Sequence, residues 1–154
     1  MPHDPARVAD TKAWMTRADA DIGAGVYDLA TELPFTGDAV FHAQQGAEKA
    51  FKAFLVWHGV AFGDTGDIGV LGRLCARIDE GLAFVGRRAA RLTDYAWKYR
   101  YPGEPEEPSE EEAEAAIDLA AEVYDAVKSR LPPEACPPGP LVGQGDGTGL
   151  STDR

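Results

Sequence analysis

Apolar residues recur at three- and four-residue steps along most of the chain, as they do on one face of an α-helix. This spacing predicts helices over residues 11–32, 38–58, 68–78, 82–95 and 110–131. The first is expected to follow an N-cap at Asp10 and to end before Pro34, and the last to follow Ser109. No stretch alternates apolar and polar residues as a half-buried strand does.

The stripe of the first segment is the most regular, and its members are expected to face the core. They are Trp14, Ala18, Ile22, Val26, Leu29 and Leu33. The second segment ends at a glycine and has a small-residue face of alanines followed by Phe51 and Phe54. Amphipathic helices joined by short loops pack best as a bundle. The predicted fold class is therefore all-α, an antiparallel four- to five-helix up-and-down bundle.

The C-terminal region has a different composition. From Pro132 onward the chain is dominated by Pro, Gly and small polar residues, which bury too little surface to offset the entropy lost on ordering. We expect one domain over residues 9–131 and a disordered tail over residues 132–154.

The net charge of −11 argues against a surface that binds nucleic acid throughout, since such binding needs positive charge. Any nucleotide or RNA must meet a local basic patch. The two cysteines, Cys75 and Cys136, form no CxxC or Cys/His cluster, so neither a metal nor a cofactor is expected. The N-terminus does not resemble a signal peptide, and no apolar run reaches the roughly 20 residues of a membrane span. These features predict a cytoplasmic protein that does not enter the membrane.

One polar row follows the second predicted helix. At 100° per residue, an arc of about 80° holds His42, Gln45, Lys49 and Lys52. An imidazole, an amide and two ammonium groups in one row could hold a phosphate, or a carboxylate of a partner. The alternative is an ordinary solvated face on which Glu48 pairs locally with both lysines.

A basic, aromatic stretch precedes the acidic connector of residues 104–108. It contains Arg87, Arg88, Arg91, Lys98 and Arg100, interleaved with Tyr95, Trp97, Tyr99 and Tyr101. Guanidinium groups bind phosphates in a bidentate manner, and aromatic faces stack on bases. In the alternative interpretation the aromatic side chains belong to the core and the arginines pair with acids of residues 104–114.

Two motifs resemble the HEPN (higher eukaryotes and prokaryotes nucleotide-binding) family. Residues 39–55, AVFHAQQGAEKAFKAFL, are similar to its "FHxQQAAEKxLKAxL" helix, and residues 92–103, LTDYAWKYRYPG, to its "LTxYAxxxRYPG" segment. The final amphipathic helix after an acidic connector also fits. The resemblance is to the branch associated with nucleotidyltransferases.

This resemblance implies an antiparallel helical bundle that is often a homodimer and is encoded beside a minimal nucleotidyltransferase, in some cases as a toxin–antitoxin module. We therefore expect a nucleotidyltransferase partner and a nucleotide or RNA ligand. The two motifs are expected to converge on one binding site. Its residues would be His42, Gln45, Lys49, Lys52, Tyr95, Arg100 and Tyr101.

The chain departs from the family in two places. Ribonuclease branches use an Arg-x4–6-His motif, but no arginine lies four to six residues before His42 or His58, and no histidine follows Arg100. Where relatives read "THDL", residues 65–68 read TGDI. Binding without catalysis is thus the leading hypothesis. Two alternatives are a degenerate, metal-independent ribonuclease that uses His42 with Arg100 or Lys49, and a purely structural dimerisation domain.

Overall fold

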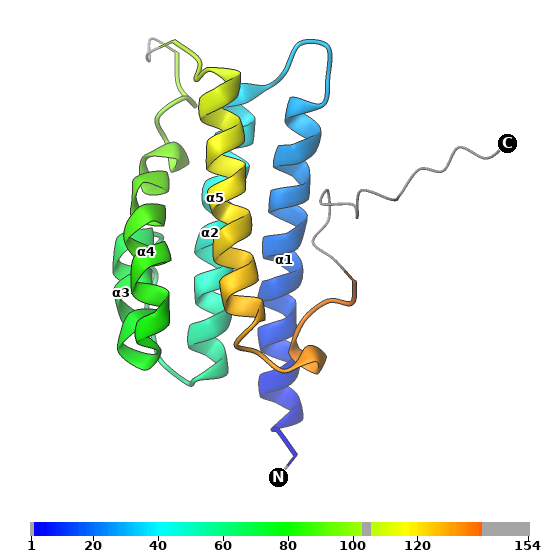
Figure 1. Ribbon diagram of the computed structural model, residues 1–154, viewed down its shortest axis with the longest axis vertical. Coiled ribbons are helices and arrows are strands. Elements are labelled where there is room, and N and C mark those ends of the chain that lie inside the picture. The colour runs from blue at the N-terminus through cyan, green and yellow to red at the C-terminus, as the bar shows by residue number, and fades with distance from the viewer. Residues whose placement is uncertain (1, 103–105, 140–154) are drawn as a thin grey trace, which may run out of the picture.

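The computed structural model describes residues 2–102 and 106–139, and its regular elements in these ranges are all helical (Figure 1). The α-helices are α1 (Pro5–Leu29), α2 (Thr36–Trp57), α3 (Ile68–Ile78), α4 (Ala83–Ala89) and α5 (Glu110–Lys128). The 3-10 segments are η1 (Glu80–Leu82), η2 (Ala90–Ala96) and η3 (Pro133–Ala135). The predicted all-α bundle is confirmed.

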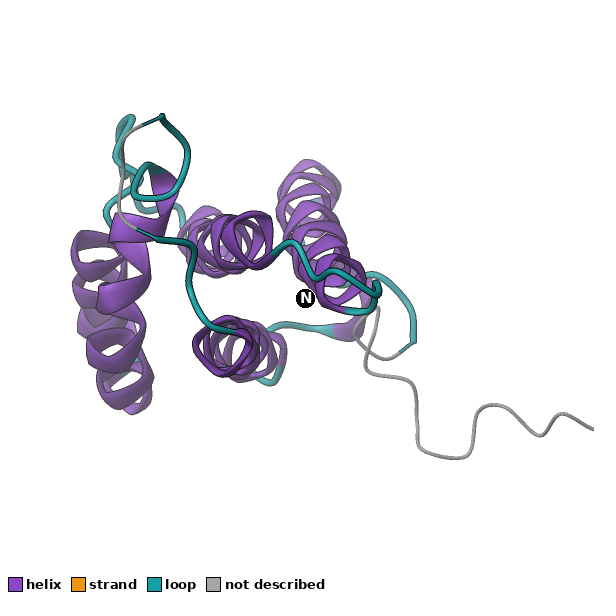
Figure 2. Ribbon diagram, turned by 90° about the horizontal axis from the view of Figure 1, so that it is seen from above, coloured by secondary structure: helices purple, strands orange, loops and turns teal. Residues whose placement is uncertain are grey.

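Three long helices surround the main core. Seen from above, α1, α2 and α5 lie around a common centre, and the hairpin of α3 and α4 packs beside α2 and α5 (Figure 2). Helix α2 is central, because it contacts α1, α3 and α5. Its buried side consists mainly of small residues and two large rings: Ala39, Val40, Ala43, Ala47, Ala50, Phe51, Ala53, Phe54 and Leu55.

Helices α1 and α2 run in opposite directions and pack closely at one glycine. A side-chain carbon at Gly46 would lie 2.5 Å from Cγ1 of the buried Ile22. The missing side chain therefore allows the two backbones to approach until Ile22 fills the space over Gly46. This contact fixes the separation of α1 and α2 at mid-length.

Helices α2, α3 and α5 run in the same direction, whereas α1 and α4 run the opposite way (Figure 1). The loop after α2 turns back along that helix, so that Gly66 lies against the Glu48 side chain before α3 begins. Further along, the Cys75 thiol donates a hydrogen bond to the Phe51 carbonyl at 3.6 Å. Burial raises the pKa of this thiol to about 12, which keeps it protonated as a donor.

The first helix starts earlier and ends earlier than predicted. Asp4 rather than Asp10 is the N-cap, since its carboxylate accepts a hydrogen bond from the Ala6 N–H at 3.0 Å and a proline occupies the first helical position. The helix ends at Leu29, so Leu33 lies in the following loop and is 83% exposed. The core position predicted for Leu33 is wrong, because Pro34 disfavours helical geometry at the residue before it.

The other helix boundaries agree more closely with the sequence pattern. Ser109 caps α5 as predicted, accepting a hydrogen bond from the Glu112 N–H at 3.0 Å. The predicted fourth helix is divided, because helical geometry tightens into the 3-10 segment η2 after Ala89. Such tightening is common in the last turns of a helix.

The folded domain extends beyond Leu131. Segment η3 packs against α1, and both Ala135 and Cys136 are buried. The sequence assigns residues 132–139 to a disordered tail. They instead pack against the bundle, because the Ala135 and Cys136 side chains are buried there. The remainder of the predicted tail, residues 140–154, lies outside the described residues.

The Gly46 contact gives a prediction about stability. Gly46→Ala should lower the free energy of unfolding by about 1–3 kcal/mol, because the new methyl group overlaps Ile22. In an Ile22→Ala background the same change should be neutral or stabilising, since alanine favours helix over glycine by about 1 kcal/mol. Urea unfolding of the four proteins measures both effects, and equal costs in the two backgrounds would show that Ile22 is not the obstacle.

Candidate functional site

A hydrogen bond and an ion pair join α1 to the predicted polar row of α2. The Nδ1 of His42 lies 2.6 Å from Oδ2 of Asp28, and the Nζ of Lys49 lies 2.5 Å from Oδ2 of Asp21. The two members on each helix are seven residues apart, or about two turns, so antiparallel helices bring both pairs into register. All four side chains are between 19% and 28% exposed. Two predicted site residues therefore join the helices to each other.

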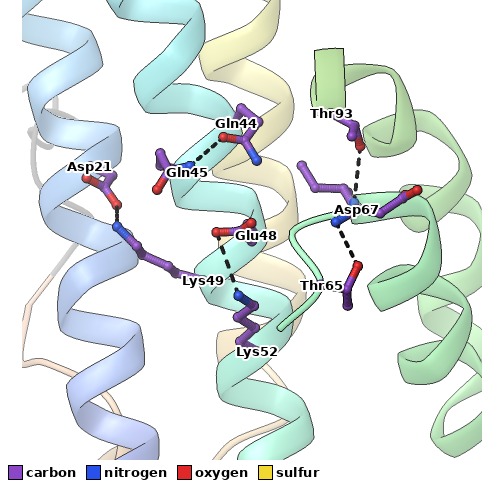
Figure 3. Close-up of polar contacts among 10 residues, drawn as sticks. Asp21, Gln44, Gln45, Glu48, Lys49, Lys52, Thr65, Asp67 and Thr93 are labelled. Carbon is purple, nitrogen blue, oxygen red and sulfur yellow. Dashed lines mark hydrogen bonds and ion pairs between the residues drawn. The ribbon is translucent and has the colours of Figure 1, made fainter. Parts of the chain in front are cut away.

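Lys52 is enclosed by a carboxylate and two rings. Its Nζ lies 3.9 Å from Oε2 of Glu48, and 5.6 Å and 5.4 Å from the ring centroids of Trp14 and Phe62. Ammonium groups are attracted to ring faces at such distances. The ion pair between Glu48 and Lys52 expected for a solvated face is present, whereas Lys49 pairs with Asp21 instead (Figure 3).

Glu48 is the buried acid of this region, with only 9% of its surface exposed. Burial raises the pKa of its carboxyl, and the two neighbouring lysines and a hydrogen bond with Gln44 offset part of that rise. Gly66 lies so close that any side chain there would collide with the carboxylate. The adjacent amides also interact, since the Gln45 side chain donates to the Gln44 side-chain oxygen at 2.6 Å.

The loop that departs from the family pattern has a structural role. The Asp67 N–H donates to the Thr65 hydroxyl at 3.1 Å, and the Asp67 carboxylate caps α3 by accepting from the Val70 N–H. The Ile68 N–H donates to the Thr93 hydroxyl of η2 at 3.1 Å (Figure 3). These bonds fix the start of α3 against η2.

The turn after η2 places Arg100 over α2. Its guanidinium carbon lies 3.9 Å from the ring centroid of Phe41, a stacked arrangement typical of arginine on an aromatic face. Phe41 and Gln45 are one turn apart, so Arg100 and the polar row lie on the same side of α2. Eight residues separate Phe41 from Lys49, about 12 Å of helix. The two predicted regions are thus neighbours along α2.

The predicted aromatic residues divide into two groups. Tyr95 and Tyr99 are half-buried, with ring centroids 6.1 Å apart, and the Tyr95 hydroxyl donates to Oε1 of Glu112 at 2.6 Å. Burial raises the pKa of Tyr95 above its usual value. In contrast, Trp97 is 53% and Tyr101 66% exposed. The core interpretation fits the first pair and is wrong for the second.

Large exposed side chains occur in this turn and in the loop that meets it at Tyr99. Tyr99 lines a hollow of about 350 Å³ together with Leu33, Phe35 and the first turn of α2. Leu33 and Phe35 are exposed. Trp97 and Tyr101, which lie two positions before and after Tyr99, are exposed as well. We call this the Arg100 surface: Leu33, Phe35, Trp97, Arg100 and Tyr101.

No ion pair among the described residues joins the basic stretch to an acid of residues 106–114. Arg88 forms an ion pair with Glu122, which lies beyond the predicted acidic stretch of residues 104–114. Within that stretch, Glu112 accepts from Tyr95 and does not form an ion pair in the described structure. Arg88 thus links α4 to α5.

Several residues of the polar row's surroundings were not predicted from the sequence. Asp21 and Asp28 were missed, although their seven-residue spacing matches that of His42 and Lys49. Trp14, which the sequence predicts to face the core, packs against it half-buried, and its ring also lies under the Lys52 ammonium group.

No group of three His, Cys, Asp or Glu side chains in residues 2–102 and 106–139 is arranged to hold a metal ion. Over the same ranges, no helix is long and apolar enough to cross a membrane.

Comparison with known proteins relates most of the chain to one family. The family model of the HEPN domain matches residues 11–130, from the first turns of α1 to just past α5. No curated protein and no solved structure matches the chain significantly.

The buried Glu48 gives a prediction about pH. Its pKa in the folded state is raised above 4.5, so the folded protein holds this proton more tightly than the unfolded chain does, and ionisation costs stability as pH rises. Glu48→Gln keeps the shape without the charge. The variant should gain stability relative to the wild type as pH increases from about 4 to 7. Urea unfolding across this range measures the difference, with the exposed Glu32→Gln as control, and a difference that shrinks with pH would contradict the prediction.

Proposed function

Because the chain belongs to the HEPN domain family, we propose that it is a binding module whose Arg100 surface docks a partner protein, a minimal nucleotidyltransferase. The supporting observation is the composition of that surface. Tryptophan, tyrosine and arginine are the residues that most often dominate binding energy at interfaces. Here Trp97 and Tyr101 are more than half exposed beside Arg100. Large apolar side chains exposed together mark a site of interaction.

The polar row of α2 supports a protein partner better than a phosphate. His42, Lys49 and Lys52 each have a carboxylate neighbour within the chain. A phosphate bound there would have to displace these carboxylates or meet their negative charge. The row serves instead to hold α1 against α2 beside the docking surface. The pair of proteins would then form a toxin–antitoxin-type module.

A nucleotide is the second candidate ligand, at the same surface. The Arg100 guanidinium can bind a phosphate, and the exposed rings of Trp97 and Tyr101 can stack on a base. Titration with ATP, followed by the fluorescence of the tryptophans, tests this candidate. The Arg100→Ala variant separates the two candidates. If it loses saturable ATP binding but keeps its affinity for the partner protein, the surface is assigned to nucleotides.

The partner proposal is tested with the minimal nucleotidyltransferase encoded nearest to this gene. Tyr101→Ala and Trp97→Ala should each weaken the complex about tenfold or more, equivalent to about 1.4 kcal/mol. Phe84→Ala is the matched control, because Phe84 is also 66% exposed but lies on α4. Isothermal titration calorimetry measures the affinities. Equal losses in all three variants, or none, would contradict the proposal.

One observation favours an enzymatic alternative. An imidazole held by a carboxylate, as His42 is by Asp28 at 2.6 Å, is the arrangement that orients a general base. Arg100 stacks on the Phe41 ring, and the centroid of that ring lies 5.7 Å from the centroid of the His42 ring. Metal-independent cleavage of single-stranded RNA would support a ribonuclease if both His42→Ala and Asp28→Asn abolish it. Cleavage that survives in both variants would assign the activity to a contaminant or to other residues.

A further inference from the structure

A second surface lies on the hairpin of α3 and α4, apart from the polar row of α2 and from the Arg100 surface. A groove of about 470 Å³ runs between these helices. Its floor is made of residues with the smallest side chains: Gly69, Ala76, Ala83, Gly86 and Ala90. Arg73 of α3 and Arg87 of α4 also line it, and both are exposed.

The sequence produces this groove by placing small residues on facing helices. A side-chain carbon at Gly72 would lie 3.1 Å from the Cα of Gly86, so the two backbones almost touch. On α3, Gly69 and Ala76 lie one turn before and one turn after Gly72. Ala83 and Ala90 flank Gly86 in the same way, and Ala90 is the first residue of η2. The result is a shallow apolar channel about two helical turns long.

Positive charge is concentrated at the groove. Neither Arg73 nor Arg87 forms an ion pair with another described residue, and Arg77 adds a third such guanidinium one turn beyond Arg73. Asp67, whose carboxylate lies near Gly69 at one end of the groove, is used to cap α3. In a chain whose net charge is −11, this face therefore has the opposite sign to the whole.

We propose that the groove is a docking site for an acidic helix of a partner protein that presents a stripe of small side chains. An extended peptide would leave its backbone N–H and C=O groups unpaired on a floor of glycine and alanine, whereas a helix satisfies its own. Small residues on both sides let the backbones approach closely, as they do at Gly72 and Gly86. Carboxylates beside that stripe would meet Arg73 and Arg87.

The chemistry of the groove favours such a helix over nucleic acid. None of the described residues that line it is aromatic, so bases have no ring to stack on. The remaining surface is acidic overall and would repel a long polyanion. The groove shares no residue with the Arg100 surface, so this proposal stands or fails independently of the function proposed above.

The test uses the full-length protein and a synthetic probe. The probe is a fluorescein-labelled, alanine-rich helical peptide of about 20 residues, with alanines along one face and glutamates beside them. Fluorescence anisotropy should show saturable binding. The double variant Arg73→Glu, Arg87→Glu should weaken binding at least about tenfold. The control Arg7→Glu, Arg17→Glu changes the net charge equally on exposed positions of α1, and should leave binding within about twofold.

Three outcomes would overturn the proposal. The first is equal binding of a scrambled peptide with the same composition, which would indicate unspecific attraction of charge. The second is tighter binding of a single-stranded RNA oligonucleotide that also depends on Arg73 and Arg87. The third is self-association seen by light scattering and lost in the double variant, which would assign the groove to a second copy of the chain. Circular dichroism verifies that each variant remains folded.

Discussion

The close contact of α1 and α2 at Gly46 is the constraint on which the rest of the structure depends. Because no side chain separates the helices there, Ile22 packs directly on the α2 backbone and the helix axes stay near each other. At that separation Asp21 reaches Lys49, and Asp28 reaches His42. The polar row that the sequence marks as a binding site therefore becomes the outer edge of a helix–helix contact. The opposite side of α2 faces the hydrophobic core.

The helices could be predicted because their signals are local. Apolar spacing, the cap at Ser109 and the glycine after α2 each act within a few residues. The partners of side chains are not local, since they depend on how two helices are aligned. Periodicity places Lys49 on the outer face but does not say that Asp21 lies opposite. Leu33 has the spacing of a core residue and loses that position only because the chain leaves the helix before it.

The aromatic segment shows the same limit at the candidate site. Tyr95 and Trp97 are both aromatic and lie two residues apart. The Tyr95 hydroxyl is hydrogen-bonded to Glu112, whereas the Trp97 side chain is 53% exposed. The difference arises because η2 has three residues per turn and then gives way to an irregular turn. A sequence pattern based on an ideal α-helix cannot resolve which ring faces α5. The Arg100 surface thus follows from the geometry after η2.

The loop that turns back along α2 has a consequence for local unfolding. It delivers α3 alongside α2 in the same direction, and the next segments, α4 and η2, return beside α3. Separation of this hairpin from the bundle would uncover Leu71 and Cys75 and leave the contacts among α1, α2 and α5 in place. Such a separation would be a sub-global opening of the kind that hydrogen exchange detects. The buried Cys75 thiol would become reachable by solvent in this opening.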